Sequence, residues 1–423
     1  MKARRIIIAV CAVFMLIGMS AYAGGAGGSG TARPTVVTFW NGFTGPDRAT
    51  VEALVERFNE SQSEITIDMQ IMPWDSFYQK LMPAYIAGTG PDLIGMDPSR
   101  VPTYAKAGRF EQLDSFLANS DALSREVLVE SLLDASTVDG KLYGMPMTFA
   151  SMVMYYNKDL FAAAGLDPEN PPRTFSELEA AWVKLLQRDS AGNITVYPQA
   201  IAIRATVPMM PVFLWGYGAE VVTSEGKSGL NSPEARKAMT FVQRAFTELN
   251  VSPVGITGGE ADELSYAGKA AIMFNGPWAL GGYKAANINV GVAEVPAGPV
   301  GKRTWGGSAV LCMNSASDVK DSAWTFMEYW NSYESQKFWA TREAFPPTRL
   351  DMEDDPVLTA NEPMKVFIKS ADYAKVFLAG VGSFGEIDGS VLTPLYESVA
   401  RGIATPEAAL QEAHEELNKI LSE

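Results

Sequence analysis

The chain has 423 residues, enough for two or three domains of about 150 residues each, which excludes a small module that depends on disulfides for stability. Hydrophobic residues make up 47% and charged residues 20% of the chain, as in an ordinary globular protein. The 34 basic and 49 acidic residues give a formal net charge of −15, which repels phosphate backbones and argues against nucleic acid as a partner.

The N-terminus has the pattern of an export signal. Three basic residues precede an apolar run over residues 6–19, and the sequence AYA at residues 21–23 is the small-x-small pattern of a signal peptidase site. This run is shorter than the roughly 20 residues that a membrane span needs, and Cys11 lies inside it and not at the cleavage point, where a lipid-modified cysteine would lie. We therefore predict a periplasmic protein, cleaved after Ala23 and not a lipoprotein, with a flexible glycine-rich leader over residues 24–33.

Strand and helix patterns alternate in the next part of the chain. Residues 35–40 (TVVTFW) form an apolar run typical of a buried strand, and the apolar residues of 51–58 have helical spacing. Residues 65–71 alternate between apolar and polar, residues 74–85 return to helical spacing, and residues 93–96 are again a short apolar run. This alternation predicts an α/β fold with a parallel sheet.

A second α/β unit follows the first. Residues 152–156 are typical of a strand, and the sequence TFSE at residues 174–177 is a capping box that opens a helix. Two further helices are predicted where a serine or threonine precedes a proline, at residues 232–233 and 405–406, because proline is favoured at the first helical position.

Patterns that resemble enzyme motifs have simpler explanations. Residues 380–385 (GVGSFG) match GxGxxG but lack a following βαβ unit, so we expect a glycine loop there and no dinucleotide site. Residues 226–228 (GKS) resemble the end of a phosphate-binding loop, but Val221 stands where that motif needs glycine. His414, the single histidine, lies on a predicted helix face, and Cys312 has no partner for a disulfide in the mature chain. We expect no cofactor and no metal.

A secreted glycoside hydrolase is an open alternative. That chemistry needs only two carboxylates, either about 5 Å or about 6.5 to 9.5 Å apart. The 49 acidic residues supply many candidates, and spacing along the sequence does not reveal such a pair.

Four tryptophans lie beside glycine, proline or asparagine at the ends of strand-like runs. In open α/β sheets ligands bind beyond the carboxyl ends of the strands, so an aromatic ring in this position can stack on a ligand. Tryptophans at helical spacing, such as Trp74, are explained by packing alone. The four tryptophans are Trp40, Trp215, Trp278 and Trp305.

Residues 146–161 (PMTFASMVMYYNKDLF) resemble the signature of family 1 extracellular solute-binding proteins, the sugar-binding components of ABC transporters that include proteins similar to maltose- and trehalose-binding proteins. Ala163 stands where that pattern usually has a polar or charged residue. Other similar segments occur in the family's order and spacing. These are GPDL at 90–93, TFSEL at 174–178, GKAAIM at 268–273, NGPW at 275–278, FPPTR at 345–349 and TPEAAL at 405–410.

The resemblance implies a periplasmic-binding-protein fold of type II, the Venus-flytrap arrangement, with the ligand cleft between two lobes that are each discontinuous in sequence. It also implies crossover segments near residues 144–147, 295–296 and 345–347. The implied domains are the signal peptide at 1–23, the leader at 24–33, lobe 1 at 34–147 plus 297–342, and lobe 2 at 148–295 plus 343–423.

For function, the resemblance implies a monomeric binding protein and not an enzyme, which captures a carbohydrate, expected to be a di- or oligosaccharide, and delivers it to the membrane permease of an ABC importer. Family members that bind glycerol phosphate or other small polar solutes leave that ligand class open, and the sequence does not separate transport from a chemosensory role. The residues expected to bind the ligand are Trp40, Asn41, Phe43, Asp97, Tyr155, Trp215, Tyr217, Trp278, Trp305 and Gly306.

Overall fold

The computed structural model describes residues 33–44, 47–204, 209–379, 381 and 383–422. The predicted signal peptide, its cleavage point, Cys11 and almost all of the leader lie outside the described residues, as does part of the glycine-rich segment 380–385. The chain divides into a unit of residues 1–33 and a unit of residues 34–423, and the helices and strands below belong to the second unit.

The first sheet is mixed and has the strand order β13-β12-β3-β1-β2, with β6 paired to β12 outside this order. Strand β1 pairs in parallel with β2 and β3, whereas β12 pairs antiparallel with β3 and β6. The strands predicted at 35–40, 65–71 and 93–96 are confirmed. The bounds are β1 (Thr35–Asn41), β2 (Ile65–Ile71), β3 (Leu93–Met96), β6 (Met145–Ser151), β12 (Thr304–Met313) and β13 (Ala374–Lys375).

Helices cover both faces of this sheet. Phe58 of α1 and Phe326 of α12 pack against Phe39 of β1 on one face, and the ring centroids of Phe58 and Phe326 are 5.1 Å apart. Phe77 of α2 packs with Ile94 of β3 in a separate cluster. The elements around this sheet are α1 (Arg48–Ser61), α2 (Trp74–Ile86), α3 (Val101–Lys106), α4 (Asp114–Ala118), α5 (Glu130–Ala135), β4 (Thr137–Val138), β5 (Lys141–Leu142), α12 (Lys320–Trp330) and α13 (Tyr333–Glu343).

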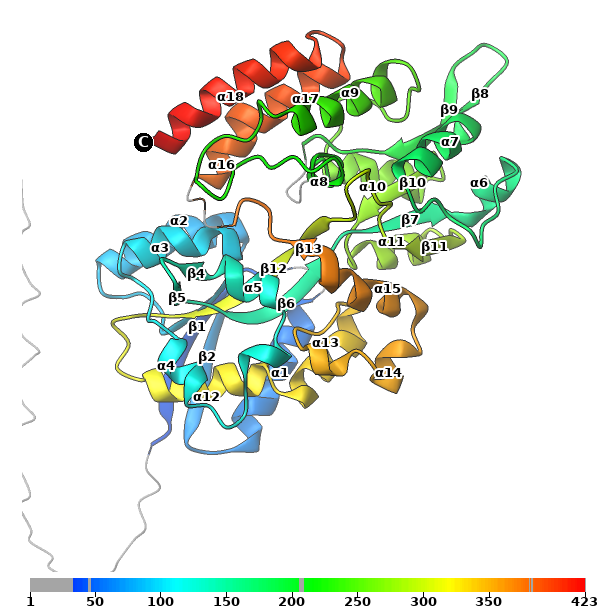
Figure 1. Cartoon of the computed structure of the whole chain (residues 1–423). Helices are drawn as coiled ribbons and strands as arrows, with labels where there is room; N and C mark the ends of the chain where they lie inside the picture. Colours follow the sequence, from blue (N-terminus) through cyan, green and yellow to red (C-terminus); the bar gives the residue numbers. More distant parts are fainter. Residues whose placement is uncertain (1–32, 45–46, 205–208, 380, 382, 423) are drawn as a thin grey trace, which may run out of the picture. The chain divides into compact units, whose positions relative to one another are not determined.

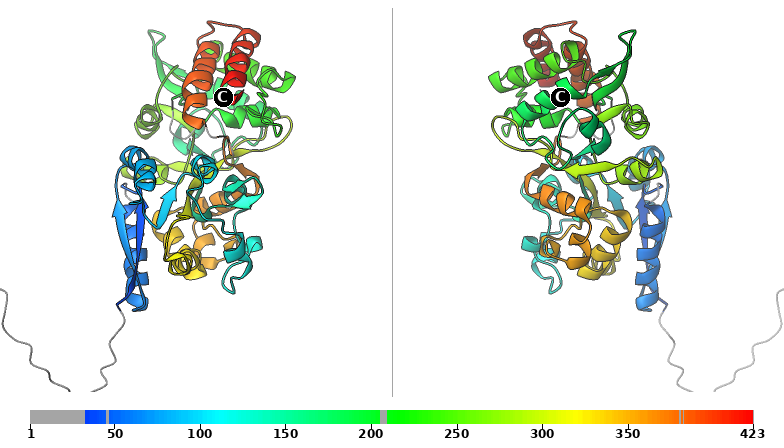
Figure 2. Two further views of the ribbon diagram at one scale, coloured as in Figure 1. Left: turned by 90° about the vertical axis from the view of Figure 1, so that its left-hand side faces the viewer. Right: turned by 90° about the vertical axis from the view of Figure 1, so that its right-hand side faces the viewer.

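The second sheet has the order β11-β7-β10-β9-β8, in which β10 is parallel to β9 and antiparallel to β7. Helices α17 and α18 pack against α9 and lie beside it in every view (Figures 1 and 2). The bounds are β7 (Val153–Asn157), β8 (Gln187–Arg188), β9 (Ile194–Ala200), β10 (Ala270–Asn275), β11 (Val290–Ala293), α6 (Lys158–Ala163), α7 (Phe175–Leu185), α8 (Pro211–Gly216), α9 (Pro233–Thr247), α10 (Gly258–Tyr266), α11 (Ala279–Ala285), α14 (Pro356–Thr359), α15 (Glu362–Ser370), α16 (Phe384–Ile387), α17 (Thr393–Ala400) and α18 (Pro406–Ser422).

Side-chain caps begin the helices where the sequence predicts them. The hydroxyl of Ser232 accepts a hydrogen bond from Ala235 N at the start of α9. At α7, Thr174 Oγ1 accepts from Glu177 N at 3.2 Å, but the Glu177 carboxylate accepts from Arg173 N, one residue before the cap. The helix start is therefore confirmed, and the return bond of the capping box is shifted by one residue.

The chain passes from the first sheet to the second at Met152. Strand β6 stays paired with β12 through Ser151, beyond the crossover expected at 144–147, and β7 begins at Val153 in the second sheet. Met152 N donates to Trp305 O at 3.0 Å, and Thr304 Oγ1 donates to Met152 O at 2.7 Å. The residue between the two sheets is therefore hydrogen-bonded on both sides to the beginning of β12.

A buried polar network holds the segment after α13 against β6. Gln336 Oε1 accepts from Thr348 N at 2.9 Å, and Gln336 Nε2 donates to Trp330 O at 3.0 Å. Trp330 Nε1 in turn donates to Met147 O at 2.7 Å. Gln336 and Thr348 have no exposed surface, so each of these hydrogen bonds satisfies a group that water does not reach.

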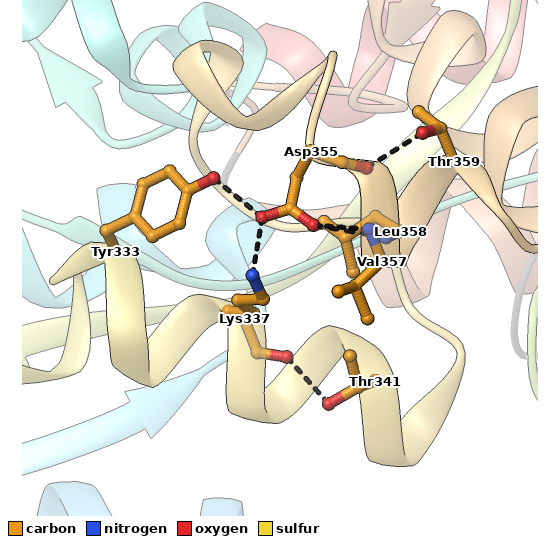
Figure 3. Close-up of polar contacts among 7 residues, drawn as sticks. All are labelled: Tyr333, Lys337, Thr341, Asp355, Val357, Leu358 and Thr359. Carbon is orange, nitrogen blue, oxygen red and sulfur yellow. Dashed lines mark hydrogen bonds and ion pairs between the residues drawn. The ribbon is translucent and has the colours of Figure 1, made fainter.

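Asp355 joins the start of α14 to α13 through side-chain hydrogen bonds (Figure 3). Its Oδ2 accepts from Tyr333 Oη at 2.7 Å and from Lys337 Nζ at 2.8 Å. Its Oδ1 accepts from the backbone N–H groups of Val357 and Leu358 at the start of α14. The ammonium and hydroxyl donors hold the pKa of Asp355 well below its usual range.

We expect Asp355→Asn to lower the free energy of unfolding at pH 7 by about 1.5 to 3 kcal/mol, because charge-assisted hydrogen bonds are lost. The pKa of the Asp355 carboxyl is lower in the folded than in the unfolded chain, so its contribution is complete above about pH 5 and declines as the pH falls below about 4. Urea unfolding at pH 7 and pH 3 should show the wild-type advantage shrinking by about 1 kcal/mol.

The control for this prediction is Glu362→Gln, which removes a carboxylate that is 80% exposed and paired with Lys365. Its effect should stay below about 0.5 kcal/mol at both pH values. An Asp355→Asn loss of the same size at pH 3 and pH 7 would contradict the assigned charge state.

Candidate functional site

Two of the predicted tryptophans meet where the sheets adjoin. The ring of Trp278, which follows β10, lies 6.3 Å from that of Trp305 on β12, at an interplanar angle of 73°. The ring of Phe345, which follows α13, also lies 6.2 Å from that of Trp278. Trp305 is 8% exposed, whereas Trp278 is 41% exposed. Trp278 therefore keeps an open aromatic surface that a ligand can cover.

A buried tyrosine supports the loop that carries Trp278. Tyr155 of β7 has no exposed surface, and its hydroxyl donates to Gly276 O at 2.7 Å. Its ring stacks on Tyr283 with centroids 5.2 Å apart. A Cβ atom on Gly276 would stand 2.3 Å from the Trp278 ring, so the ring can occupy this position only beside glycine. Tyr155 was predicted as a ligand contact, and in the structure it holds the loop through Gly276 O.

An ion pair between Lys375 and Glu220 lies next to Trp305. Lys375 of β13 is the register partner of Trp305 on β12, and its Nζ donates to Glu220 Oε1 at 2.7 Å. Glu220 Oε2 accepts from Trp215 Nε1 at 3.3 Å. These three residues line a pocket of about 590 Å³. Trp278, Trp305, Lys375, Glu220 and Trp215 therefore form a sequence of neighbouring side chains.

The carboxyl ends of β1 and β3 carry a second group. Trp40 is half-buried near the end of β1 and belongs to the apolar cluster that also contains Ala374 and Val376, which flank Lys375. Asn41 has no exposed surface, and its Oδ1 accepts from Phe43 N at 3.2 Å. Because β1 and β3 are parallel, their carboxyl ends lie at one edge of the sheet.

Asp97 follows β3 at the same edge. Its Oδ1 accepts from Ser99 N at 2.8 Å and Ser99 Oγ at 2.6 Å, and burial raises the pKa of the Asp97 carboxyl. Asp97 N donates to Tyr78 Oη at 3.1 Å. The Tyr78 ring stacks on Trp74 with centroids 5.7 Å apart, and the Arg100 guanidinium lies 3.9 Å from its centroid. Sequence reasoning missed Tyr78 and Arg100, and it assigned Trp74 to packing.

Two of the predicted residues are enclosed by other aromatic rings. Phe43 is 5% exposed and has Trp74 and Trp339 at 5.5 and 6.0 Å. Tyr217 packs against Phe241 and lines a groove of about 890 Å³, whereas Trp215, two residues earlier, lines the pocket with Glu220 and Lys375. Phe43 is linked to Trp278 through the rings of Trp339 and Phe345, whereas the ring contacts of Tyr217 are with Phe175 and Phe241.

Gly306 has a role in strand packing. A Cβ atom at this position would stand 2.6 Å from Ala374 Cβ, so glycine lets β13 approach β12 and brings Lys375 beside Trp305. The neighbouring Ser308 has a φ of 121°, a conformation that L-residues rarely adopt, and its hydroxyl is 2.7 Å from that of Thr148 on β6.

Neither a metal cluster nor a membrane-spanning helix is found in the part of the chain that the structure describes. No group of three or more His, Cys, Asp or Glu side chains there is placed to hold a metal ion. No helix there is long and apolar enough to cross a bilayer. Cys312 is a buried free thiol, and burial raises its pKa.

Comparisons with known proteins agree with this architecture. A Brucella abortus (strain 2308) protein, whose name states only that it is a binding protein, is 29% identical over 404 residues, covering 93% of this chain and 94% of its own. The galactooligosaccharide-binding protein of Bacillus subtilis (strain 168) is 23% identical, covering 84% of this chain and 83% of its own.

A solved ABC transporter solute-binding protein of Thermotoga lettingae TMO, bound with α-D-tagatose, superposes with a TM-score of 0.76 at 27% identity, covering 92% of this chain and all of its own. The two-lobe α/β fold implied by the resemblance is thus confirmed. The family model for bacterial extracellular solute-binding proteins matches residues 43–337. The chain therefore belongs to the family of bacterial extracellular solute-binding proteins.

Proposed function

We propose that this protein captures a carbohydrate, a di- or oligosaccharide, outside the cytoplasm and delivers it unchanged to the membrane permease of an ABC importer. The observation that carries the proposal is the open surface of Trp278 beside Trp305, where the two sheets adjoin. An aromatic surface covers the apolar C–H face of a pyranose ring. The names of the relatives support this ligand class, since one binds galactooligosaccharides and one structure holds tagatose.

The polar groups beside the aromatic rings suit sugar hydroxyls. Glu220 and Lys375 are each 43% exposed, so both can hydrogen-bond a ligand without leaving water completely. Asp97 lies at the same sheet edge as Trp40. Trp278 offers an open stacking surface, and the Glu220–Lys375 pair lies beyond Trp305, so a ligand of more than one sugar ring could contact both. The proposed contacts from the sequence are Trp40, Asn41, Asp97, Trp215, Trp278, Trp305 and Gly306, to which we add Glu220, Lys375 and Phe345.

The two lobes would close around the ligand by a hinge. We place one lobe on the first sheet and the other on the second, with the hinge at Met152, at the segment after β11, at residues 345–349 and at the segment after β13. Hinge closure of periplasmic binding proteins is a standard example of such a domain motion. The mature protein would begin after Ala23, act in the periplasm as a monomer and present its closed form to the permease.

Binding without reaction is favoured over glycoside hydrolysis by the family to which the chain belongs. Hydrolysis needs one carboxylic acid and one carboxylate placed to act on the substrate. The family model that the chain matches describes solute-binding proteins, whose task is to bind a solute. We therefore infer that the protein is not an enzyme.

A thermal-shift screen tests this proposal. The mature protein, residues 24–423, is mixed separately with tagatose, maltose, maltotriose, raffinose, galactooligosaccharides and glycerol 3-phosphate. A ligand that binds only the folded state raises the melting temperature, because at 100 times its Kd it adds about 2.7 kcal/mol to stability. We expect a neutral sugar to stabilise the protein and to be recovered intact by chromatography. Stabilisation by glycerol 3-phosphate alone, or breakdown of the sugar, would overturn the proposal.

Removing the exposed ring of Trp278 should weaken sugar binding. Trp278→Ala loses stacking of about 1 kcal/mol or more, which corresponds to a severalfold rise in Kd measured by calorimetry. The melting temperature without ligand should change little, because the side chain is 41% exposed. Leu350→Ala, which shortens a side chain that is 42% exposed elsewhere, is the control and should leave the Kd unchanged. Equal affinity of Trp278→Ala and the wild type would remove Trp278 from the site.

A methyl group on Gly276 should have a similar effect without removing any aromatic ring. The added Cβ atom of Gly276→Ala would displace the Trp278 ring, so we expect a severalfold rise in Kd and a shifted Trp278 signal in the ¹⁹F spectrum of protein labelled with 5-fluorotryptophan. Gly259→Ala places its methyl in open space and should leave both unchanged. An unshifted Trp278 signal in Gly276→Ala would show that the loop does not depend on this glycine.

A further inference from the structure

The pocket beside Trp215 contains one positive and one negative side chain. Among its lining residues, Lys375 is the positive one and Glu220 the negative one, and their Nζ and Oε1 atoms are 2.7 Å apart. The remaining lining residues carry no formal charge, so the pocket is electrically neutral although it contains a lysine. A lysine in a binding pocket ordinarily attracts phosphate or carboxylate, and here the partner carboxylate cancels that attraction.

The orientation of Glu220 is fixed from two sides. Its Oε1 accepts from Lys375 and its Oε2 accepts from the Trp215 indole at 3.3 Å. Trp215 is itself 4% exposed, and its ring packs against Phe377 with centroids 5.8 Å apart. Because the indole is held by packing, the carboxylate is held in the pocket with Lys375.

The pair also joins two segments that are far apart in the sequence. Lys375 lies on β13, beside Trp305 of β12, whereas Glu220 follows α8, which packs against both α9 and β12. A solvent-exposed ion pair contributes only about 0 to 1 kcal/mol to folding stability. We therefore look for the effect of this pair in the charge that it presents to a ligand.

We propose that the Glu220–Lys375 pair makes this site selective for uncharged sugars against sugar acids and sugar phosphates. This inference rests on the proposed function, because it concerns the ligand class of the same site. A neutral sugar exchanges hydroxyl hydrogen bonds with both members of the pair and leaves each of them satisfied. An anion would gain Lys375 but would face the carboxylate of Glu220 at close range, and like charges at such distances discriminate strongly between ligands.

The test compares the wild type with Glu220→Gln, which keeps the size of the side chain and removes its charge, although one of its two acceptor oxygens becomes an NH2 donor. Calorimetry measures the Kd of matched pairs: maltose with maltose 6′-phosphate, galactobiose with digalacturonic acid, galactose with galacturonic acid, and glucose with glucuronic acid and with glucose 6-phosphate. For the pair whose neutral member binds the wild type, we expect Glu220→Gln to shift the ratio of the two affinities toward the acid by at least tenfold. The shift should shrink as salt is raised from 50 to 500 mM.

Glu169→Gln is the matched control, because it removes the same charge from an ion pair whose residues do not line this pocket. Glu169 and Lys158 are 2.8 Å apart, and their side chains are 76% and 27% exposed. This variant should leave the affinity ratio at the wild-type value. An equal shift in Glu169→Gln would show that the effect comes from net charge and would overturn the proposal.

Lys375→Met provides a second variant if Glu220→Gln does not fold. It leaves Glu220 as the one charge of the pocket, so the acid should bind more weakly than it binds the wild type, and neutral binding should weaken severalfold. Tighter acid binding by Lys375→Met, or an unchanged ratio in a folded Glu220→Gln, would contradict the inference about selectivity. If no neutral sugar in any panel binds the wild type, the proposed function itself is wrong, which is a separate result.

Discussion

The structure depends on the hydrogen bonds that join Met152 to the beginning of β12. One residue separates β6 in the first sheet from β7 in the second, and both of its backbone polar groups are bonded to Thr304 and Trp305. Because a buried backbone group without a partner is costly, this junction fixes where the chain can leave one sheet for the other. Trp305 therefore occupies a fixed place where the two sheets adjoin, between Trp278 and Lys375.

The exposed ring at the site is supported by groups that water does not reach. Tyr155 is completely buried and holds the carbonyl of Gly276, two residues before Trp278. On the other side, Phe345 precedes a segment whose Thr348 is bonded through Gln336 to the core of α13. Tyr155, Gln336 and Thr348 have no exposed surface, so these supporting residues act from inside the protein. Buried supports of this kind suit a site that must be rigid before a ligand arrives.

Local patterns in the sequence predicted the elements well, because strand alternation, apolar stripes and cap residues depend on nearby residues alone. The strands β1, β2 and β3 and the starts of α7 and α9 illustrate this. The candidate site was only partly predictable. Tyr78 lies within a regular apolar stripe, so nothing in its spacing separates a site residue from a core residue. Glu220 and Lys375 are 155 positions apart and are joined by folding alone, and the two-residue strand β13 that carries Lys375 leaves no periodic signal.

The exposure of the Glu220–Lys375 ion pair bears on how the site can release a ligand. Lys375 and Glu220 are each 43% exposed, so each can exchange its partner for a sugar hydroxyl and remain hydrated, which a completely buried ion pair cannot do without a large desolvation penalty. At the neighbouring sheet edge, Arg100 lies over the ring of Tyr78, three residues from Asp97. Polar contacts that exchange easily bind a sugar without holding it irreversibly. A protein that must release its cargo to a transporter needs this property, whereas an enzyme needs a carboxylate that is free to react.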